Sequence, residues 1–418
     1  MTTETTDRVN GPDAGKASPE RTERRERIWT RGFTALFIIS LVTNVSQSMM
    51  VSLVPVDASA MGATPVMVGV VSGAFAISAL AVRPLIGATS LRFRIRSLLI
   101  IDLCVLVLAF VLYALASNVE TLLAARLVHG IGMGFLAPLT LALVANTLPE
   151  SRMAAGVGMF SVGQAIALGI GPAVGLAVAA QIGFSWTFAG GAGLMAVAAG
   201  LAFILARDRS FVAQPFRFRL RGLLAREALL PAAVIFLLAS AFAVVNTFVV
   251  LSAHASKIPQ PGLFFTVYAG VLLLARPICG RLADKHGIRA VAIPAAVVFG
   301  VALVTLSLTT TVAWLLVSAA LVALGYGVCQ PLLQTLGVLS VRKEDRALAG
   351  STLYTGVDLA YLLAPIAAGA VATSGSTAAS GYSEMFLWCA APVAVAVLVL
   401  GISGRRRRQP RRVTSTDG

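Results

Sequence analysis

Charged residues are scarce in this sequence. Asp, Glu, Lys and Arg make up 12% of the 418 residues, whereas 57% are hydrophobic. About a quarter of the residues in a water-soluble domain are usually charged. The composition therefore excludes a soluble globular protein of this length and favours one that lies in a lipid bilayer.

Residues that bind metals or carry out catalysis are also few. The chain has 3 His and 4 Cys, and no two cysteines form a C-x-x-C pair. The glycine-rich stretch 130–134 lacks the Lys-Ser/Thr of a phosphate-binding loop, and neither a Ser/His/Asp arrangement nor an ATPase motif occurs. The sequence therefore predicts no enzyme activity, no cofactor and no metal site. We expect small core residues at the cysteines, which are Cys104, Cys279, Cys329 and Cys389.

Long apolar runs are what the sequence has in abundance. A transmembrane helix needs about 20 mostly apolar residues. Twelve such runs follow one another with short polar segments between them, so we predict an all-α membrane protein of twelve transmembrane helices. The expected spans are residues 32–55, 64–87, 98–117, 119–145, 154–181, 185–206, 230–253, 261–280, 290–309, 311–340, 347–372 and 383–403.

The positive charges are distributed unevenly between these runs. The formal net charge is +15, and 29 of the 33 Lys and Arg lie in the two ends of the chain or in every second loop. The intervening loops contain only Lys257. Because cytoplasmic loops carry the excess of Lys and Arg in membrane proteins, we expect both termini in the cytoplasm. This pattern favours a multi-pass protein of a bacterial inner membrane over a nucleic-acid-binding protein.

The expected spans fall into two groups of six. The basic stretch 207–229 between them is the longest internal loop and predicts a linker. The first 28 residues are rich in Thr, Arg and Glu and have no apolar face, which is typical of disorder. The predicted organisation is a disordered cytoplasmic arm (1–28), an N-terminal six-helix bundle (29–206), a basic cytoplasmic linker (207–229), a C-terminal six-helix bundle (230–403) and a basic cytoplasmic tail (404–418).

The two groups of spans repeat one another in sequence. Residues 83–87 (RPLIG) match residues 276–280 (RPICG) at an offset of 193, and Gln164 matches Asp358 at an offset of 194. Parallel repeats related by an axis along the membrane normal are an architecture of secondary transporters. In such proteins the substrate site lies between the repeats near the bilayer midplane. We therefore expect two pseudo-symmetric halves around a central site.

A loop after the eighth expected span carries a family signature. Residues 280–289 read GRLADKHGIR, which resembles the G-x-L-a-D-r-x-G-r-r loop of the major facilitator superfamily. The resemblance implies a transporter whose cytoplasmic ends are latched by this loop in one conformation. The first-half copy, residues 87–96, departs from the family pattern because Leu91 stands where the second half has Asp284. The implied latch residues are Gly87, Arg96, Gly280, Arg281, Asp284, Gly287 and Arg289.

The fourth expected span contains an arginine. Residues 122–132 (LLAARLVHGIG) resemble the family pattern l-x-x-x-R-x-x-q-G-x-g, with His129 in place of the usual Gln. In relatives this arginine is implicated in proton coupling, so the resemblance implies that role for Arg126. His129 lies three residues further on and therefore on the same helix face. The alternatives are an arginine that snorkels to the outer surface and an ordinary core histidine.

The fifth expected span contains a Gly-Pro pair. Residues 163–175 (GQAIALGIGPAVG) resemble the g-x-x-x-G-P-x-x-G-g signature that marks proton-coupled exporters in this family more than importers. A proline weakens the helix ladder, and small residues allow close packing, so a bend and a packing face are compatible readings. The residues implied in the bend are Gly171, Pro172 and Gly175.

One acidic residue lies deep in an expected span. Asp358 is about eleven residues into the span 347–372, where an acid costs ~2.5–3.5 kcal/mol on insertion scales. Its repeat mate is the neutral Gln164, so packing alone does not require a charge there. We interpret Asp358 as a proton-coupling or substrate-contacting residue with Arg126 nearby in electrostatic terms. The alternative is a hydrogen-bonded structural acid.

Further polar and aromatic residues lie in the middle of expected spans. The resemblance implies that spans one, four, seven and ten line a cavity. As a set, these residues predict an amphipathic cavity with few fixed charges, although each one alone is more often ordinary packing. The predicted cavity residues are Asn44, Gln47, Gln164, Phe242, Asn246, Tyr326, Gln330, Tyr354 and Tyr361.

These features together predict a secondary active transporter of small molecules. We expect proton-coupled efflux of amphipathic drugs or metabolites by alternating access, with no nucleic-acid partner and a monomeric protein. A dedicated exporter of one metabolite, such as a metallophore or a sugar, is the alternative, and an importer is a third possibility. A membrane sensor or scaffold would require a sizeable soluble domain, which the sequence does not contain.

Overall fold

The computed structural model describes residues 29–148, 153–205, 225–342 and 346–406. These residues form helices and short connections, and no strand occurs among them. The elements are α1 (Arg31–Ala60), α2 (Pro65–Gly73), α3 (Phe75–Arg92), α4 (Ile95–Leu115), α5 (Val119–Thr147), α6 (Met153–Ile182), α7 (Phe184–Ala202), η2 (Arg226–Ala228), α8 (Leu229–Ala255), α9 (Leu263–His286), α10 (Ile288–Ser307), α11 (Val312–Val322), η3 (Ala323–Gly327), α12 (Val328–Val338), α13 (Arg346–Ser374), α14 (Ala378–Trp388) and α15 (Ala390–Arg406).

Twelve helical segments are long and apolar enough to cross a membrane, which confirms the predicted fold class. Four of them consist of more than one element, and one of these joins η2 directly to α8. The helix breaks at Ala74 between α2 and α3 and at Cys389 between α14 and α15. The five residues of η3 form one turn of π-helix between α11 and α12.

Most differences from the expected spans lie at helix ends. Helix α1 continues to Ala60, α9 to His286 and α15 to Arg406. Backbone hydrogen bonds continue a helix beyond the hydrocarbon layer, whereas hydropathy marks only the part that lipid contacts. The end of the predicted linker forms the short helix η2. The predicted arm, most of the linker and most of the tail lie outside the described residues.

Polar caps begin four of the six helices that start at the end of the molecule poor in Lys and Arg. The side chains of Thr64, Thr311 and Thr377 each accept a hydrogen bond from a backbone N–H in the first turn of α2, α11 and α14, respectively. Asn118 forms a capping box with Thr121 at the start of α5. Such caps satisfy N–H groups that have no partner within the helix. They allow the chain to turn at this end in short loops.

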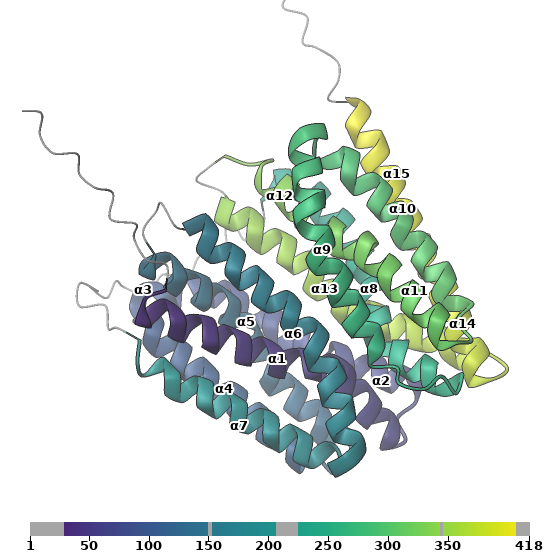
Figure 1. Cartoon of the computed structure of the whole chain (residues 1–418), viewed down its shortest axis with the longest axis horizontal. Coiled ribbons are helices and arrows are strands. Elements are labelled where there is room, and N and C mark those ends of the chain that lie inside the picture. The colour runs from purple at the N-terminus through teal and green to yellow at the C-terminus, as the bar shows by residue number, and fades with distance from the viewer. Residues whose placement is uncertain (1–28, 149–152, 206–224, 343–345, 407–418) are drawn as a thin grey trace, which may run out of the picture.

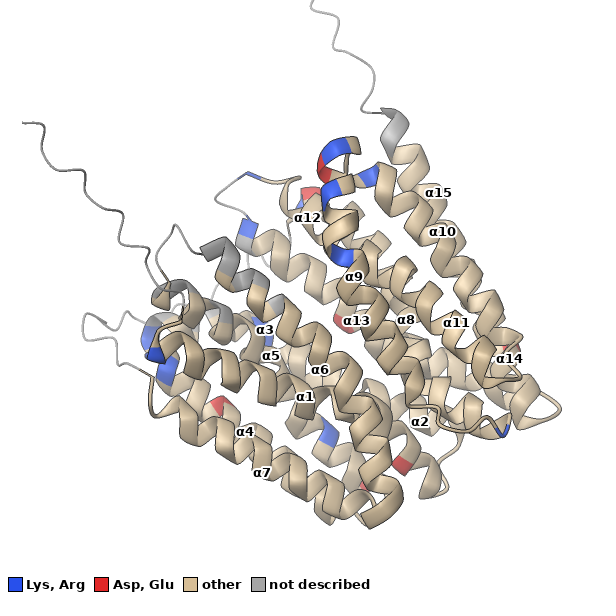
Figure 2. Cartoon of the chain, viewed as in Figure 1, with Lys and Arg blue, Asp and Glu red and all other residues tan. Residues whose placement is uncertain are grey.

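The helices form two halves, α1–α7 and α8–α15, which lie side by side in Figure 1. Within the N-terminal half, α1 packs against α6 and α4 packs against α5 and α7. Within the C-terminal half, α13 packs against α8 and α10 against α15. Figure 2 shows that Lys and Arg of the described residues gather mainly at one end of each half. The charge asymmetry of the sequence is therefore an asymmetry between the two ends of the bundle.

Glycines close the two halves against each other at the end poor in Lys and Arg. A Cβ atom placed on Gly69 of α2 would lie 2.3 Å from the carbonyl oxygen of Pro365 in α13, and one on Gly73 would lie 2.6 Å from that of Tyr361. A Cβ on Gly369 would lie 2.4 Å from the carbonyl oxygen of Pro65. Only hydrogen atoms fit in these places, so α2 and α13 are in backbone contact there.

The halves are less close at the basic end. A Cβ atom placed on Gly280 or on Gly350 would meet no atom within 4 Å. Asp284 is exposed and forms no ion pair with any residue that the structure describes. No close helix approach therefore occurs at Gly280 in this conformation. Whether these residues form a latch in another conformation stays a prediction.

The remaining latch residues act within their own halves in this structure. Arg96 donates hydrogen bonds to the carbonyl oxygens of Ala202 (3.1 Å) and Phe203 (2.6 Å) at the end of α7. Its repeat mate Arg289 donates to that of Ser403 (3.1 Å) near the end of α15. A cation at a helix C-terminus stabilises carbonyl groups that lack partners. The two arginines thus attach the last helix of each half.

The other latch positions lie at the same end. Gly287 has a backbone φ of +94° at the turn between α9 and α10, a conformation that favours glycine. Arg281 is exposed on α9. Gly87 lies in α3, and its contacts are outside what the structure describes. The motif glycine Gly287 is therefore required by the turn itself.

Candidate functional site

A cavity of about 530 Å³ lies between the two halves. This volume is within the range of small-molecule sites. Five helices of the N-terminal half (α1, α2, α3, α5 and α6) and two of the C-terminal half (α8 and α13) line it. We call the end closed by Gly69, Gly73 and Gly369 the sealed end. Along α5 the cavity extends from Arg126, near the sealed end, to Val144, near the basic end. The polar or ionisable lining residues are Ser40, Thr43, Asn44, Gln47, Ser72, Arg83, Arg126, His129, Thr140, Gln164, Asn246, Thr247, Tyr354, Asp358 and Tyr361.

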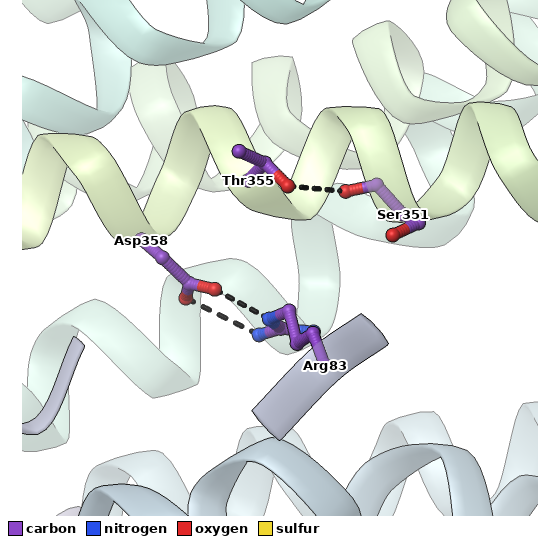
Figure 3. A network of polar contacts seen from close by, with 4 residues as sticks. All are labelled: Arg83, Ser351, Thr355 and Asp358. Carbon is purple, nitrogen blue, oxygen red and sulfur yellow. Dashed lines mark hydrogen bonds and ion pairs between the residues drawn. The ribbon is translucent and has the colours of Figure 1, made fainter. Parts of the chain in front are cut away.

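A salt bridge between Arg83 of α3 and Asp358 of α13 crosses this cavity and joins the two halves. The guanidinium Nε and one terminal nitrogen of Arg83 donate to the two carboxylate oxygens of Asp358, the second bond at 3.2 Å. Figure 3 shows the two side chains pointing toward each other. The Tyr354 ring lies 5.1 Å from the guanidinium carbon. Such a two-pronged pair is geometrically specific, and its position couples the charge of Asp358 to the arrangement of the halves.

Arg126 has a different set of partners. It donates to the carbonyl oxygen of Ser72 from its terminal nitrogen (3.1 Å) and Nε (3.4 Å), and its guanidinium carbon lies 4.8 Å from the Phe75 ring. Ser72 is in the last turn of α2, immediately before the helix break at Ala74. The arginine therefore binds a backbone carbonyl beside the discontinuity between α2 and α3.

His129 extends this polar group into the N-terminal half. Its Nδ1 lies 3.0 Å from the Tyr113 hydroxyl and 3.5 Å from a terminal nitrogen of Arg126. Because a guanidinium has only donors, Nδ1 accepts in the second contact. The Nε2 atom of His129 is buried and has no hydrogen-bond partner among the described residues. The histidine thus links Arg126 to the core rather than to Asp358.

An amide and a hydroxyl of the C-terminal half form a hydrogen bond beside Arg126 and Phe75. Asn246 of α8 donates from Nδ2 to the hydroxyl oxygen of Tyr361 in α13 (2.8 Å). The Tyr361 ring meets the Phe75 ring edge to face, with centroids 5.8 Å apart. Phe75 therefore contacts both Arg126 and Tyr361. Polar and aromatic groups of both halves meet near the sealed end of the cavity.

A family model for the Major Facilitator Superfamily matches residues 36–258 and 232–418. The chain belongs to the Major Facilitator Superfamily. It is therefore a member of a family of multi-pass membrane transporters, and its twelve candidate spans fit that family.

Curated relatives of this transporter match it over part of their length. A triacylglyceride transporter of Mycolicibacterium hassiacum is 29% identical over 38% of this chain and 30% of its own. The staphylopine export protein of Staphylococcus aureus is 26% identical over 35% of this chain and 36% of its own. A probable multidrug-efflux transporter of Mycobacterium tuberculosis is 38% identical over 23% of this chain and 21% of its own. The chain thus spans about a third or less of these proteins.

Among solved structures, the transporter resembles a bacterial homologue of the human lysosomal transporter Spinster. The TM-score is 0.73 at 15% identity, over 89% of this chain and 96% of the other. At this identity the likeness concerns the fold. It agrees with the two-half, twelve-span arrangement described above.

Nine of the twelve residues predicted for proton coupling or for the substrate cavity of this transporter line the cavity. The three residues expected to act in proton coupling all line the cavity; they are Asp358, Arg126 and His129. However, Asp358 is paired with Arg83 and not with Arg126. Arg126 is 6% exposed and lines the cavity, which argues against snorkelling. The predicted cavity residues that line it are Asn44, Gln47, Gln164, Asn246, Tyr354 and Tyr361.

Three predicted cavity residues lie elsewhere. Phe242 and Tyr326 are buried in the C-terminal half, where their ring centroids stack 4.0 Å apart, and the Tyr268 ring also stacks on that of Phe242. Tyr326 belongs to the π-turn η3, whose additional residue changes the faces that span ten presents. Gln330, one turn further on, is not among the residues lining the cavity. The placement of span ten at this cavity is therefore wrong for these residues.

Sequence reasoning missed Arg83 as the partner of Asp358. A signal was present, because Arg83 is a cation within an apolar run and an acid within lipid needs a counter-charge. However, three arginines lie in or at the ends of spans, namely Arg83, Arg126 and Arg276. Only the packing of α3 against α13 distinguishes among them.

The Gly-Pro pair of α6 is a packing site in this structure. A Cβ atom placed on Gly171 would lie 1.9 Å from Ser48 Oγ of α1, and one on Gly175 would lie 3.2 Å from side-chain atoms of α1. Ser48 also donates to the carbonyl oxygen of Ala167 in α6 (2.6 Å). Helix α6 continues through Pro172 to Ile182. The packing face is thus present, and the bend at Gly171, Pro172 and Gly175 stays a prediction.

Proposed function

We propose that this transporter exports small amphipathic molecules in exchange for protons, by alternating access between its two halves. The observation that carries the proposal is the salt bridge between Arg83 and Asp358. Asp358 is an acid of the cavity, and its partner belongs to the opposite half. A proton on Asp358 removes the charge that holds the pair together, so protonation and the separation of α3 from α13 are coupled.

The lining of the cavity supports an amphipathic substrate. Amide groups of Asn44, Gln47 and Asn246 share the surface with apolar side chains such as Phe75 and Phe160. Apolar walls with a few placed polar groups are typical of small-molecule sites. The only charges of this lining belong to Arg83, Arg126 and Asp358. A largely apolar molecule with one or two polar groups fits this surface.

Two observations support export. The sequence rule for positive charges places the basic end in the cytoplasm, so the sealed glycine contacts face outward and the cavity extends toward the cytoplasm. Relatives include proteins named for staphylopine export and multidrug efflux. A dedicated exporter of one metabolite is the second candidate, favoured by the staphylopine export relative. Export of unrelated compounds by one protein would exclude it.

The test uses purified transporter in proteoliposomes with an imposed pH gradient and a panel of amphipathic dyes and metabolites. We expect uphill movement of at least one compound in the wild-type protein. The Asp358→Asn variant should bind this compound but lose gradient-driven movement, because its side chain carries no exchangeable acid proton. Gradient-driven transport that persists in Asp358→Asn would refute the coupling.

Asp102→Asn is the matched control for this test. Asp102 is a buried acid of α4, 5% exposed, and it does not line the cavity. The same chemical change is therefore made in a span outside the substrate path. We expect this variant to retain gradient-driven transport. Equal loss in both variants would indicate a general effect of buried acids on folding rather than coupling.

A further inference from the structure

The pseudo-symmetry of the halves places a second arginine opposite the Arg83–Asp358 salt bridge. The halves meet where α13 packs on α2 and α3, and again where α6 packs on α9. The repeat mate of Arg83 in α3 is Arg276 in α9, and that of Asp358 in α13 is Gln164 in α6. At the second interface a neutral amide thus replaces the carboxylate that balances the arginine at the first.

Arg276 and Gln164 line one small cavity. This cavity has a volume of about 240 Å³, and its polar lining also includes Asn44 and Gln47. Asn44, Gln47 and Gln164 line the main cavity as well, so the two spaces lie side by side. Gln164 is exposed within this otherwise apolar region of α6. Arg276 therefore lies next to the main cavity, on the far side of residues that line both spaces.

Hydrogen-bond donors in this small cavity lack partners. The Nε atom of Arg276 is buried and has no hydrogen-bond partner in the described part of the chain, and the same is true of Nε2 of Gln47. Among the described residues, no carboxylate forms an ion pair with Arg276. Arg276 as a whole is partly exposed, and a guanidinium with a buried donor that lacks a partner favours an anion beside it. Arg126 differs, because it already donates to the Ser72 carbonyl.

We propose that Arg276, together with Gln47 and Gln164, binds a carboxylate group of the substrate. The substrate would thus supply at this interface the charge that Asp358 supplies at the other. Charge supports the inference, because Arg83 and Asp358 cancel while Arg126 and Arg276 leave the joined cavities positive. This proposal rests on the proposed function only in requiring that the cavity holds substrate, and it defines that substrate as an amphipathic acid.

The test measures equilibrium binding in a neutral detergent without any gradient. The probes are naphthalene-1-acetate and naphthalene-1-acetamide, which differ in charge and have nearly the same shape. We expect the acid to bind the wild-type protein at least tenfold more tightly than the amide in isothermal titration calorimetry. Arg276→Gln should remove this preference by weakening the acid alone. Lys285→Gln, which removes an exposed charge from the same helix, should preserve it.

A second variant tests the missing carboxylate without a ligand. Gln164→Asp recreates the arrangement of Arg83 and Asp358 beside Arg276. We expect it to raise the thermal unfolding temperature and to weaken binding of the acid at least tenfold by competing for Arg276. In an Arg276→Gln background the same substitution should lower the unfolding temperature, because the new acid then has no partner. Equal shifts in both backgrounds would overturn the proposal.

The remaining outcomes are also decisive. Equal binding of acid and amide by the wild-type protein, or no binding of the acid, would overturn the carboxylate site. Loss of the preference in Arg126→Gln but not in Arg276→Gln would assign the anion to the other arginine and overturn it as well. Asp358→Asn should keep the preference for the acid. A failure of proton coupling is therefore distinguishable from a failure of substrate binding.

Discussion

At the scale of residues, ionisable side chains in the cavity are held by partners from distant parts of the chain. Arg83 and Asp358 are 275 positions apart and neutralise each other across the two halves. Arg126 instead meets a backbone carbonyl and an aromatic face. The two arginines therefore respond differently to the loss of Asp358: Arg83 loses its counter-charge, whereas Arg126 keeps its contacts.

The salt bridge can be tested by a double-mutant cycle. Arg83→Gln leaves the Asp358 carboxylate without its counter-charge, so we expect a loss of about 1–3 kcal/mol in the free energy of unfolding. Asp358→Asn in the same background should restore most of this loss, since neither charge then remains. Denaturant unfolding in detergent provides the measurement. Additive effects of the two substitutions would mean that the pair contributes no coupling energy.

At the scale of elements, the contact between α2 and α13 decides which end of the cavity is sealed. Three glycines, Gly69, Gly73 and Gly369, bring the backbones of the two helices together. Small residues at such crossings allow the close packing on which helix association in membranes depends. The same glycines make the contact sensitive to any added side chain. A larger side chain at one of these glycines should therefore push α2 and α13 apart and open the sealed end of the cavity.

The Gly73→Val variant tests this closure. Its side chain cannot fit beside the Tyr361 carbonyl oxygen, so we expect α2 and α13 to separate and the population to shift toward the alternative conformation. Spin labels at Met67 and Thr373 in a cysteine-free background should report a longer distance by double electron–electron resonance. Gly190→Val is the control, because a Cβ there meets no atom within 4 Å. An unchanged distance in Gly73→Val would contradict the assignment of this contact as the seal.

At the scale of the whole molecule, the positive charges distinguish the two ends of the bundle (Figure 2). Orientation in the membrane determines whether the cavity extends toward the cytoplasm or the outside, and hence the meaning of the sealed end. The export direction proposed above depends on the basic end lying in the cytoplasm.

Labelling of single cysteines tests this orientation. In intact cells, a membrane-impermeant maleimide should label Ser376→Cys, in the loop between α13 and α14, but should label Lys285→Cys only after permeabilisation. Both positions are exposed in the structure. Each variant controls for the reactivity of the other once the membrane is opened. The reverse pattern would invert the cavity and remove the support that the charges give to export.

Several features of this protein could be predicted from its sequence because they depend on each residue separately. Span number follows from the cost of transferring each segment into lipid, and the two-half organisation follows from repeated residues such as Arg83 and Arg276. The depth of Asp358 in its span also follows from position alone. These quantities add up along the chain, so no knowledge of packing is needed.

The tertiary structure decided which groups meet. Pairing of Asp358 with Arg83, burial of Phe242 against Tyr326 and attachment of α7 by Arg96 each depend on the rotation and approach of helices far apart in sequence. Several arginines offer the same charge, and only distance distinguishes them, because a salt bridge forms over a few ångströms. Periodicity and hydropathy contain no such distances. The sequence by itself therefore determined a twelve-span repeat protein with ionisable residues inside its spans. The packing of its halves determined which of those charges are paired.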